Sequence, residues 1–134
     1  MYKINQYIEV VGTVIVSEGK ILCVQRSEKM QLAHFWEFPG GKVEEGESFE
    51  EALVREIQEE LSCLVAVGKR LARTPHATKE RAIVLNTYLC KLIKHEPQLI
   101  EHEDLCWLDP ADLNTLKWAE ADIPTVDILM SSNL

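Results

Sequence analysis

The segment from Gly41 to Cys63 constrains the fold of this chain more than any other, because it predicts a long amphipathic helix. Ser48 is followed three residues later by Glu51, the spacing of a capping box in which each side chain hydrogen-bonds to the other residue's backbone. After this start, apolar residues recur at the spacing of one helix face. They are Phe49, Ala52, Leu53, Ile57 and Leu61. The sequence therefore predicts a helix that begins after Ser48 and packs this face against a core.

The same helix carries three glutamates, Glu56, Glu59 and Glu60, within an arc of roughly 100° around its axis. Such a cluster costs stability, because like charges at positions i and i+4 repel by about 0.2–0.5 kcal/mol. Carboxylates near the carboxyl end also oppose the helix dipole. One interpretation is a solvated acidic face that pairs with lysines and arginines. The other is a site for Mg²⁺ or Mn²⁺, which prefer hard oxygen ligands.

The residues around the helix favour the metal site. Residues 36–42 read WEFPGGK, an apolar strand ending in a Pro-Gly-Gly turn where backbone groups can approach a ligand closely. From Gly41 the order is a glycine, any five residues, a glutamate, any seven residues, and then the run REIQEE at 55–60. This order resembles the Nudix box, and every charged position of that pattern is matched here at the right spacing.

Two positions depart from the box pattern. Ser62 stands where the family has glycine, and Cys63 stands where it prefers a larger aliphatic residue. Because the glycine normally ends the helix in a left-handed conformation, Ser62 either adopts that strained conformation or ends the helix differently. Cys63 is expected to be a small buried hydrophobe. Neither position supplies a ligand, so the departures affect the local turn and not the chemistry.

The resemblance implies a metal centre built on this helix. In the family, the box carboxylates bind the essential divalent cation and take part in catalysis, a backbone carbonyl completes the shell, and a further acid supports it. The matching residues here are Glu56, Glu59 and Glu60, the carbonyl of Gly40, and Glu47. Arg55 matches the arginine that orients the box carboxylates by bidentate pairing. The implied cofactor is Mg²⁺, with Mn²⁺ as the alternative.

Further site residues are implied outside the box. Glu101 lies where MutT-like members of the family place an additional catalytic or metal-binding glutamate, and Glu103 is its nearby competitor. Arg26 closes the second predicted strand, where related proteins contact the phosphates. Each of these residues also fits a solvent-exposed position. The four histidines, at positions 34, 76, 95 and 102, show no ligand spacing, so we assign them no role.

The resemblance also implies a nucleobase pocket formed by Phe35, Arg81 and Asp122. A carboxylate can accept a hydrogen bond from the exocyclic amine of cytosine or guanine, so Asp122 suits this task chemically. Asp122 is equally suited to cap the last predicted helix. Phe35 can stack on a base or pack in the core, as strand aromatics usually do. Both alternatives stay open for each residue.

Composition limits the remaining function classes. The 134 residues fit one domain, 1–134, and a net charge of −8 argues against a duplex nucleic-acid surface. An acidic protein can still hold a polyphosphate if divalent cations bridge the two sets of negative charge. No apolar run is long enough for a bilayer, and residues 1–6 lack the layout of a signal peptide, so we expect a cytoplasmic protein. The four cysteines form no CxxC pair, which predicts reduced, mostly buried thiols.

The rest of the chain reads as short strands broken by turns and two or three helices. A hairpin is predicted from 8–16 and 21–25, and later strands are predicted at 65–74, 81–92 and 105–108. A helical turn starts at 109–110, and 122–124 opens a last helix. This pattern belongs to the α/β (α+β) class. The resemblance implies a Nudix-type α/β/α sandwich with a mixed β-sheet.

The implied function is Mg²⁺-dependent hydrolysis of a nucleoside triphosphate of ribose or deoxyribose to the monophosphate and pyrophosphate. The base is either an oxidised guanine, as in 8-oxo-dGTP, or a cytosine, and either Glu59 or Glu101 takes the proton from water. A first alternative keeps this site for another nucleoside diphosphate derivative, such as ADP-ribose or a dinucleoside polyphosphate. A second is a non-catalytic module that only binds a nucleotide. The expected partner is the small nucleotide, and the protein itself is expected to be a monomer or a homodimer.

Overall fold

Two runs of apolar and β-branched residues form the centre of the sheet. In the computed structural model, which describes residues 7–131, β1 spans Ile8–Ser17 and β2 spans Lys20–Gln25. A tight turn at Glu18 and Gly19, both with positive φ, joins them. The predicted hairpin is thereby confirmed, with each strand one residue longer at the turn. Residues 1–6, on which the expectation about a signal peptide rests, lie outside the described residues.

Five further strands complete a mixed sheet. They are β3 (Trp36–Glu37), β4 (Gly40–Lys42), β5 (Leu64–Ala77), β6 (Ala82–Lys94) and β7 (Asp104–Leu108). The order of strands in the sheet is β3-β2-β1-β6-β5. In addition, β4 pairs with β1 and β7 pairs with β2. The β1–β6 pair is parallel and the other pairs between strands are antiparallel. The predicted mixed sheet is therefore confirmed.

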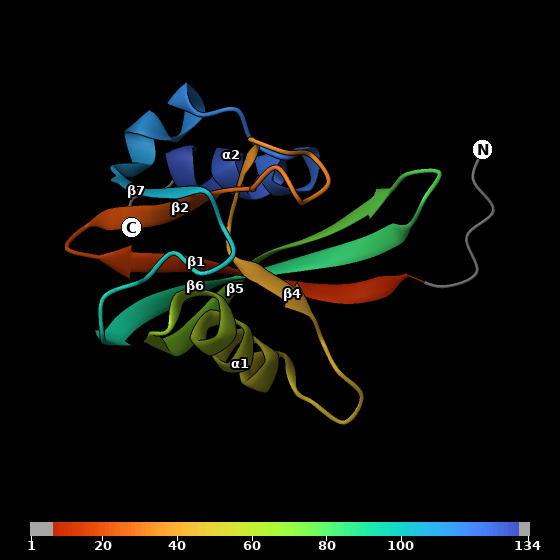
Figure 1. The fold of residues 1–134 in the computed structure, drawn as a ribbon, viewed down its shortest axis with the longest axis horizontal. Coiled ribbons are helices and arrows are strands. Elements are labelled where there is room, and N and C mark those ends of the chain that lie inside the picture. The colour runs from red at the N-terminus through yellow and green to blue at the C-terminus, as the bar shows by residue number, and fades with distance from the viewer. Residues whose placement is uncertain (1–6, 132–134) are drawn as a thin grey trace.

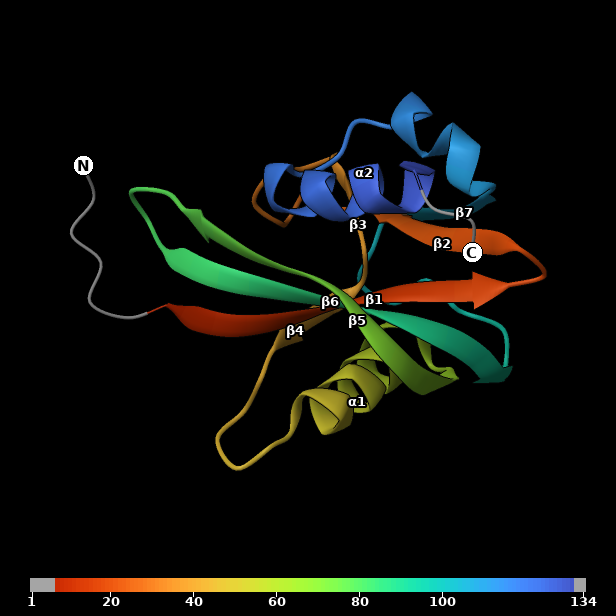
Figure 2. The same cartoon turned by 180° about the vertical axis from the view of Figure 1, so that it is seen from behind.

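Helices cover both faces of this sheet (Figures 1 and 2). On one face α1, Phe49–Leu61, packs against β1, β4 and β5. On the other lie α2, Ile123–Ser131, and two 3₁₀ helices at Pro110–Thr115 and Glu120–Asp122. Because side chains alternate along a strand, neighbouring β1 residues enter different cores. The first core contains Val14 and the second Ile15. The α/β/α sandwich is thus confirmed.

The glycines before the helix do not form the predicted turn. Residues 40–42 instead make β4, in which Gly40 pairs with Gly12 and Gly41 pairs with Val11. A Cβ atom on Gly40 would lie 1.9 Å from the carbonyl oxygen of Val11. Only glycine therefore allows the two backbones to approach this closely. As a result, the start of the box lies beside β1 at the centre of the sheet.

The hairpin after α1 is longer than the sequence predicts. We placed Pro75 in the connection between two strands, but β5 continues through it to Ala77, and Pro75 pairs with Val84. Proline is tolerated in a strand at a sheet edge, where its missing N–H needs no partner. Because, among the described strands, β5 pairs with β6 alone and forms this edge, the strand continues where the sequence suggests a stop.

The ends of α1 explain its boundaries. The hydroxyl of Ser48 accepts from the amide of Glu51 at 3.0 Å, and the Glu51 carboxylate accepts from the amide of Ser48 at 2.9 Å, which confirms the capping box. At the other end Ser62 has φ 54° and ψ 38°, and its N–H donates to the carbonyl of Gln58. Ser62 thus adopts the left-handed conformation for which the family uses glycine.

Replacing Ser62 with glycine should therefore stabilise the protein. A left-handed residue other than glycine costs about 1–2 kcal/mol, and glycine loses about 0.5–1 kcal/mol more chain entropy on folding. The expected net gain in the free energy of unfolding is about 0.5 kcal/mol, measured by urea denaturation. Ser17→Gly, within a strand, is the control and should destabilise. A loss for Ser62→Gly equal to that control would contradict the interpretation.

The structure bears on two further expectations, reduced thiols and the lack of a membrane-spanning segment. All four cysteines are free; Cys23, Cys63 and Cys90 are buried and Cys106 is half-buried, as predicted. Across residues 7–131, no helix combines the length and apolarity needed to span a membrane.

Candidate active site

Arg55 organises the acidic residues at the start of the site. Its Nε donates to Glu47 Oε2 at 2.6 Å and its Nη2 donates to Glu47 Oε1 at 2.9 Å, a bidentate pair. The same guanidinium holds Glu56 at 2.9 Å and Glu59 at 3.3 Å through Nη1. The hydrogen bonds from Arg55 lower the pKa of Glu47 to about 2. Both oxygens of Glu47 are thereby occupied by a cation of the chain.

Glu56 lies against the glycine that begins the box. A Cβ atom placed on Gly41 would be 2.6 Å from the carboxyl carbon of Glu56. The carboxyl group therefore occupies the space that any other residue at 41 would fill. Together with Arg55, the bare backbone of β4 fixes where the Glu56 carboxyl group lies.

Glu60 is the most unusual acid of the chain. Its side chain is buried, 6% exposed, and its Oε2 atom has no hydrogen-bond partner among the described residues. Burial, followed by the neighbouring carboxyl groups of Glu56, Glu37 and Glu101, raises the pKa of Glu60 to about 10. An orphaned buried carboxyl oxygen is costly unless something cationic completes its environment. Hard oxygens so arranged fit a divalent cation such as Mg²⁺.

The third box glutamate differs from the other two. The side chain of Glu59 is 57% exposed and turns toward Arg55. Within the described part of the chain, the three box glutamates do not place one oxygen each within 4.8 Å of one another. The convergence expected from helix spacing is therefore present for Glu56 and Glu60, which contact each other, and not for Glu59.

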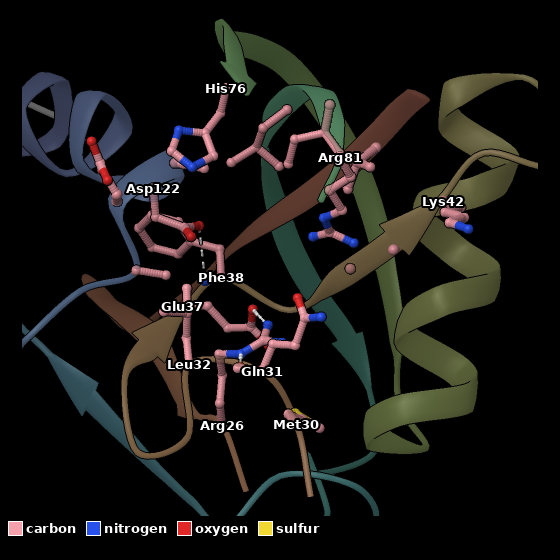
Figure 3. A pocket seen from close by; sticks show the side chains of 18 of the residues that line it. Arg26, Met30, Gln31, Leu32, Glu37, Phe38, Lys42, His76, Arg81 and Asp122 are labelled. Carbon is pink, nitrogen blue, oxygen red and sulfur yellow. Dashed lines mark hydrogen bonds and ion pairs between the residues drawn. The ribbon is translucent and has the colours of Figure 1, made fainter. Parts of the chain in front are cut away.

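A cavity of about 430 Å³ opens beside Glu60 (Figure 3). Of the residues predicted for the site, six line it: Arg26, Gly40, Glu60, Arg81, Glu101 and Asp122. In Figure 3, Asp122 and Phe38 lie on one side of the cavity and Lys42 and Arg81 on the other. Phe35 does not line it; its ring packs under the Lys117 ammonium, 4.7 Å from the ring centre.

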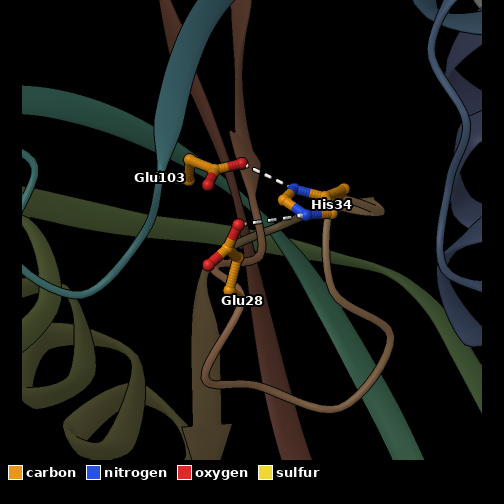
Figure 4. A group of neighbouring side chains, drawn as sticks. All are labelled: Glu28, His34 and Glu103. Carbon is orange, nitrogen blue, oxygen red and sulfur yellow. Dashed lines mark hydrogen bonds and ion pairs between the residues drawn. The ribbon is translucent and has the colours of Figure 1, made fainter.

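The alternatives Glu101 and Glu103 separate in space. Glu101 lines the cavity, whereas Glu103 Oε2 lies 2.7 Å from His34 Nδ1. Figure 4 shows this exposed group, in which Glu28 approaches the other ring nitrogen at 4.0 Å. Glu103 therefore belongs to a polar contact with His34 between two surface loops. The geometry favours Glu101 as the acid that faces a ligand.

Asp122 lies at the far side of the cavity, just before α2. It is buried, and Oδ1 accepts a hydrogen bond from the Phe38 amide at 3.3 Å. Its carboxylate thus binds the segment between β3 and β4, and within residues 7–131 it makes no capping hydrogen bond to α2. Burial, with the nearby charge of Glu37, raises the pKa of Asp122 well above its usual value.

Two residues that contact each other beside Glu60 were missed by the sequence reasoning, as was Lys42, which lines the cavity. Glu37, in β3, accepts from Arg26 Nη1 at one carboxylate oxygen and contacts His102 Nε2 at 2.8 Å through the other. The same Nε2 lies 3.8 Å from Glu60 Oε1. A charged residue in the apolar run WEF was the available signal for Glu37. His102 had no signal, because its two partners, Glu37 and Glu60, come from two distant segments.

A mixed sheet between helices, with a buried glutamate of α1 beside a cavity lined by cationic side chains, is the arrangement that the resemblance to the Nudix family implies. The model of the NUDIX domain matches residues 7–127. The chain therefore belongs to the Nudix hydrolase family.

Relatives and solved structures narrow this placement to the MutT type. The chain is 39% identical to CTP pyrophosphohydrolase of Escherichia coli (strain K12) over 124 residues, 92% of each protein. It is 38% identical to putative 8-oxo-dGTP diphosphatase 2 of Mycobacterium tuberculosis over 116 residues, 84% of this chain and 81% of the relative. The solution structure of DNA mismatch repair protein MutT from methicillin-resistant Staphylococcus aureus 252 has a TM-score of 0.79 and 47% identity, covering 97% of this chain and all of that one.

Proposed function

We propose that this chain is a nucleoside triphosphate pyrophosphohydrolase that uses Mg²⁺ to release a nucleoside monophosphate and pyrophosphate. The observation that carries the proposal is the orphaned oxygen of buried Glu60 beside a cavity lined by three cationic side chains. These are Arg26, Lys42 and Arg81. The carboxyl groups suit a divalent cation, and the cations suit the phosphates that such an ion accompanies. Similarity over nearly the whole chain to a CTP pyrophosphohydrolase and to 8-oxo-dGTP diphosphatases supports the same reaction.

The box residues divide into ligands and supports. Glu56, Glu60 and the Gly40 carbonyl would hold the cation, with Glu101 facing it across the cavity. A bound divalent cation neutralises phosphate charge and lowers the pKa of a coordinated water molecule. Arg55 fixes Glu56 and occupies both oxygens of Glu47, so we assign these two residues a supporting role.

The proton of the attacking water requires a base at the cavity. Water attacks a phosphorus of the polyphosphate chain, the bond to the bridging oxygen breaks, and pyrophosphate leaves. We assign the proton to Glu101, which lines the cavity, in preference to Glu59, which is drawn to Arg55 outside it. Arg26, Lys42 and Arg81 would bind the phosphate oxygens throughout.

The nucleobase would lie near Asp122. A protonated carboxyl group offers one donor and one acceptor, which matches N3 and the N4 amine of cytosine. An ionised carboxylate offers only acceptors, which matches the N1–H and the exocyclic amine of guanine or its oxidised form. The raised pKa of Asp122 favours the protonated form and hence cytosine.

The pH dependence of base preference tests this assignment. Because the pKa of Asp122 is raised, kcat/KM for CTP or dCTP should be highest below that pKa and fall above it, while kcat/KM for 8-oxo-dGTP should rise. Asp122→Asn, whose amide offers an N–H donor to N3 and a carbonyl acceptor to the N4 amine, should keep cytosine hydrolysis and lose this opposite pH dependence. Asp122→Ala should lower kcat/KM by about tenfold or more, the cost of a lost buried hydrogen bond. Identical pH profiles for the two bases would contradict the role.

The experiment that tests the function is a substrate panel. Product release with Mg²⁺ would be measured for ordinary and oxidised nucleoside triphosphates, ADP-ribose and dinucleoside polyphosphates. We expect pyrophosphate from a triphosphate. Hydrolysis of ADP-ribose or a dinucleoside polyphosphate alone would overturn the substrate class, and no hydrolysis of any compound would favour a binding module.

A further inference from the structure

His102 lies between two carboxyl groups from different parts of the fold. Its side chain is 1% exposed, and it lies on the loop before β7, far in sequence from both Glu37 and Glu60. Nε2 is 2.8 Å from Glu37 Oε2 and 3.8 Å from Glu60 Oε1. Since the Glu37 carboxylate also accepts from Arg26, Nε2–H donates to Glu37 and faces Glu60. Nδ1 has no partner among the described residues.

Glu37 anchors this imidazole. One of its oxygens accepts from Arg26 Nη1 and the other from His102, so neither is free to rotate toward Glu60. The ring therefore keeps Glu37 and Glu60 apart, although each would otherwise repel the other at close range. It also decides which oxygen of Glu60 faces the imidazole, namely Oε1, and which remains the orphaned atom, Oε2.

We infer that His102 is a positioning residue for Glu60, holding its carboxyl group so that Oε2 is presented to the divalent cation. The inference rests on the proposed function only in taking Glu60 as a metal ligand. It assigns His102 no contact with the nucleotide. Residues that orient metal ligands from behind typically change metal affinity by about 10- to 100-fold when they are replaced.

The test compares three substitutions of one residue by their affinity for Mn²⁺. His102→Leu removes the donor, His102→Gln places an amide N–H at the reach of Nε2, and His102→Asn places it only at the reach of Nδ1. Metal-free protein would be titrated with Mn²⁺, and the free ion followed by electron paramagnetic resonance. We expect the Leu and Asn variants to lose affinity roughly tenfold or more, and the Gln variant to retain that of the wild type.

A matched control comes from the same loop. Glu103→Gln removes the carboxylate from the exposed polar contact with His34 and should leave Mn²⁺ affinity unchanged. Circular dichroism verifies folding of each variant. If the Leu variant fails to fold, the Gln and Asn variants still carry the test, because they share the same chemistry and differ only in reach. Equal Mn²⁺ affinity for Gln and Asn, or a wild-type affinity for Leu, would overturn the inference.

Kinetics separate this inference from the proposed function. In an active enzyme, His102→Leu should lower kcat at a fixed Mg²⁺ concentration and leave KM for the nucleotide unchanged, since the ring orients a ligand and does not bind substrate. If the wild type hydrolysed no nucleotide but the Gln and Asn variants still differed in Mn²⁺ affinity, the proposed function would fail and the inference would stand. Normal hydrolysis by every variant together with equal Mn²⁺ affinity would leave the function standing and remove the inference.

Discussion

Replacing Glu60 with glutamine should lower kcat by about 10²- to 10³-fold with the fold intact. A metal ion contributes several kcal/mol to the stabilisation of the transition state, and each 1.4 kcal/mol corresponds to about a factor of ten. The amide keeps the shape of the buried side chain and loses the charge that would hold the ion. Pyrophosphate release and Mn²⁺ titration measure the two effects. Glu50→Gln, on the exposed first turn of α1, is the control and should be near wild type.

In metal-free protein, the stability of Glu60→Gln should also depend on pH differently from that of the wild type. The pKa of Glu60 is about 10 in the folded chain against 4.5 for an ordinary glutamate, so its protonated form is favoured by folding. The stability linked to this proton is fully present below pH 4.5 and is lost as pH rises toward 10. Glutamine does not titrate. As pH rises within this window, the free energy of unfolding of the variant relative to that of the wild type should therefore increase by up to about 1.4 kcal/mol per pH unit.

Urea denaturation in the presence of a chelator, between about pH 5 and 8, measures this difference. The free-energy difference should shrink when saturating Mn²⁺ is added, because binding of a cation displaces the proton from Glu60. A difference that does not change with pH would show that the carboxyl group is ionised in the metal-free protein. Near-normal hydrolysis by Glu60→Gln would remove Glu60 from the metal centre altogether.

Local signals in the sequence were sufficient for the elements that depend on near neighbours. The capping box of Ser48 and Glu51 predicted the start of α1, and the β-branched runs predicted the β1–β2 hairpin. Both depend on contacts between residues close in the chain. The left-handed conformation of Ser62 was one of two predicted alternatives, since a helix end can also be closed without it.

Pairing between distant segments could not be predicted in this way. The parallel β1–β6 register joins residues that are more than seventy positions apart, such as Ile8 and Ile83, and no local pattern specifies it. The same holds for β4, whose three residues are a strand only because Gly12 and Val11 lie beside them. Pro75 was predicted outside the strand for a related reason, since a proline is tolerated in β5 because that strand lies at the edge of the sheet.

The residues of the site also separate into those set by local contacts and those set by distant ones. The box spacing identified Arg55, Glu56 and Glu60, whose geometry follows from one helix and the strand before it. Glu59 shares that helix, yet its orientation depends on competition for Arg55. His102 acquires its position from Glu37 and Glu60 together, so only the folded chain reveals it.

Two adjacent glycines of β4 should respond differently to a single added methyl group. In Gly40→Ala, Cβ would lie 1.9 Å from the Val11 carbonyl oxygen, a backbone atom that can yield only by separating β1 from β4. The free energy of unfolding should fall by about 3 kcal/mol or more, a large part of the 5–15 kcal/mol of a typical domain. In Gly41→Ala, Cβ meets the carboxyl group of Glu56 at 2.6 Å, and this end of a side chain can move away.

Gly41→Ala should therefore lose about 1 kcal/mol or less of stability, while its Mn²⁺ affinity falls because Glu56 has left its position. Urea denaturation and Mn²⁺ titration of the two variants separate the effects. If Gly41→Ala binds Mn²⁺ like the wild type, the Glu56 carboxyl group is not held in place by the bare backbone of β4. If Gly40→Ala is as stable as the wild type, β4 is free to move away from β1. The close pairing of these strands would then not fix the Gly40 carbonyl, which we propose as a backbone ligand of the divalent cation.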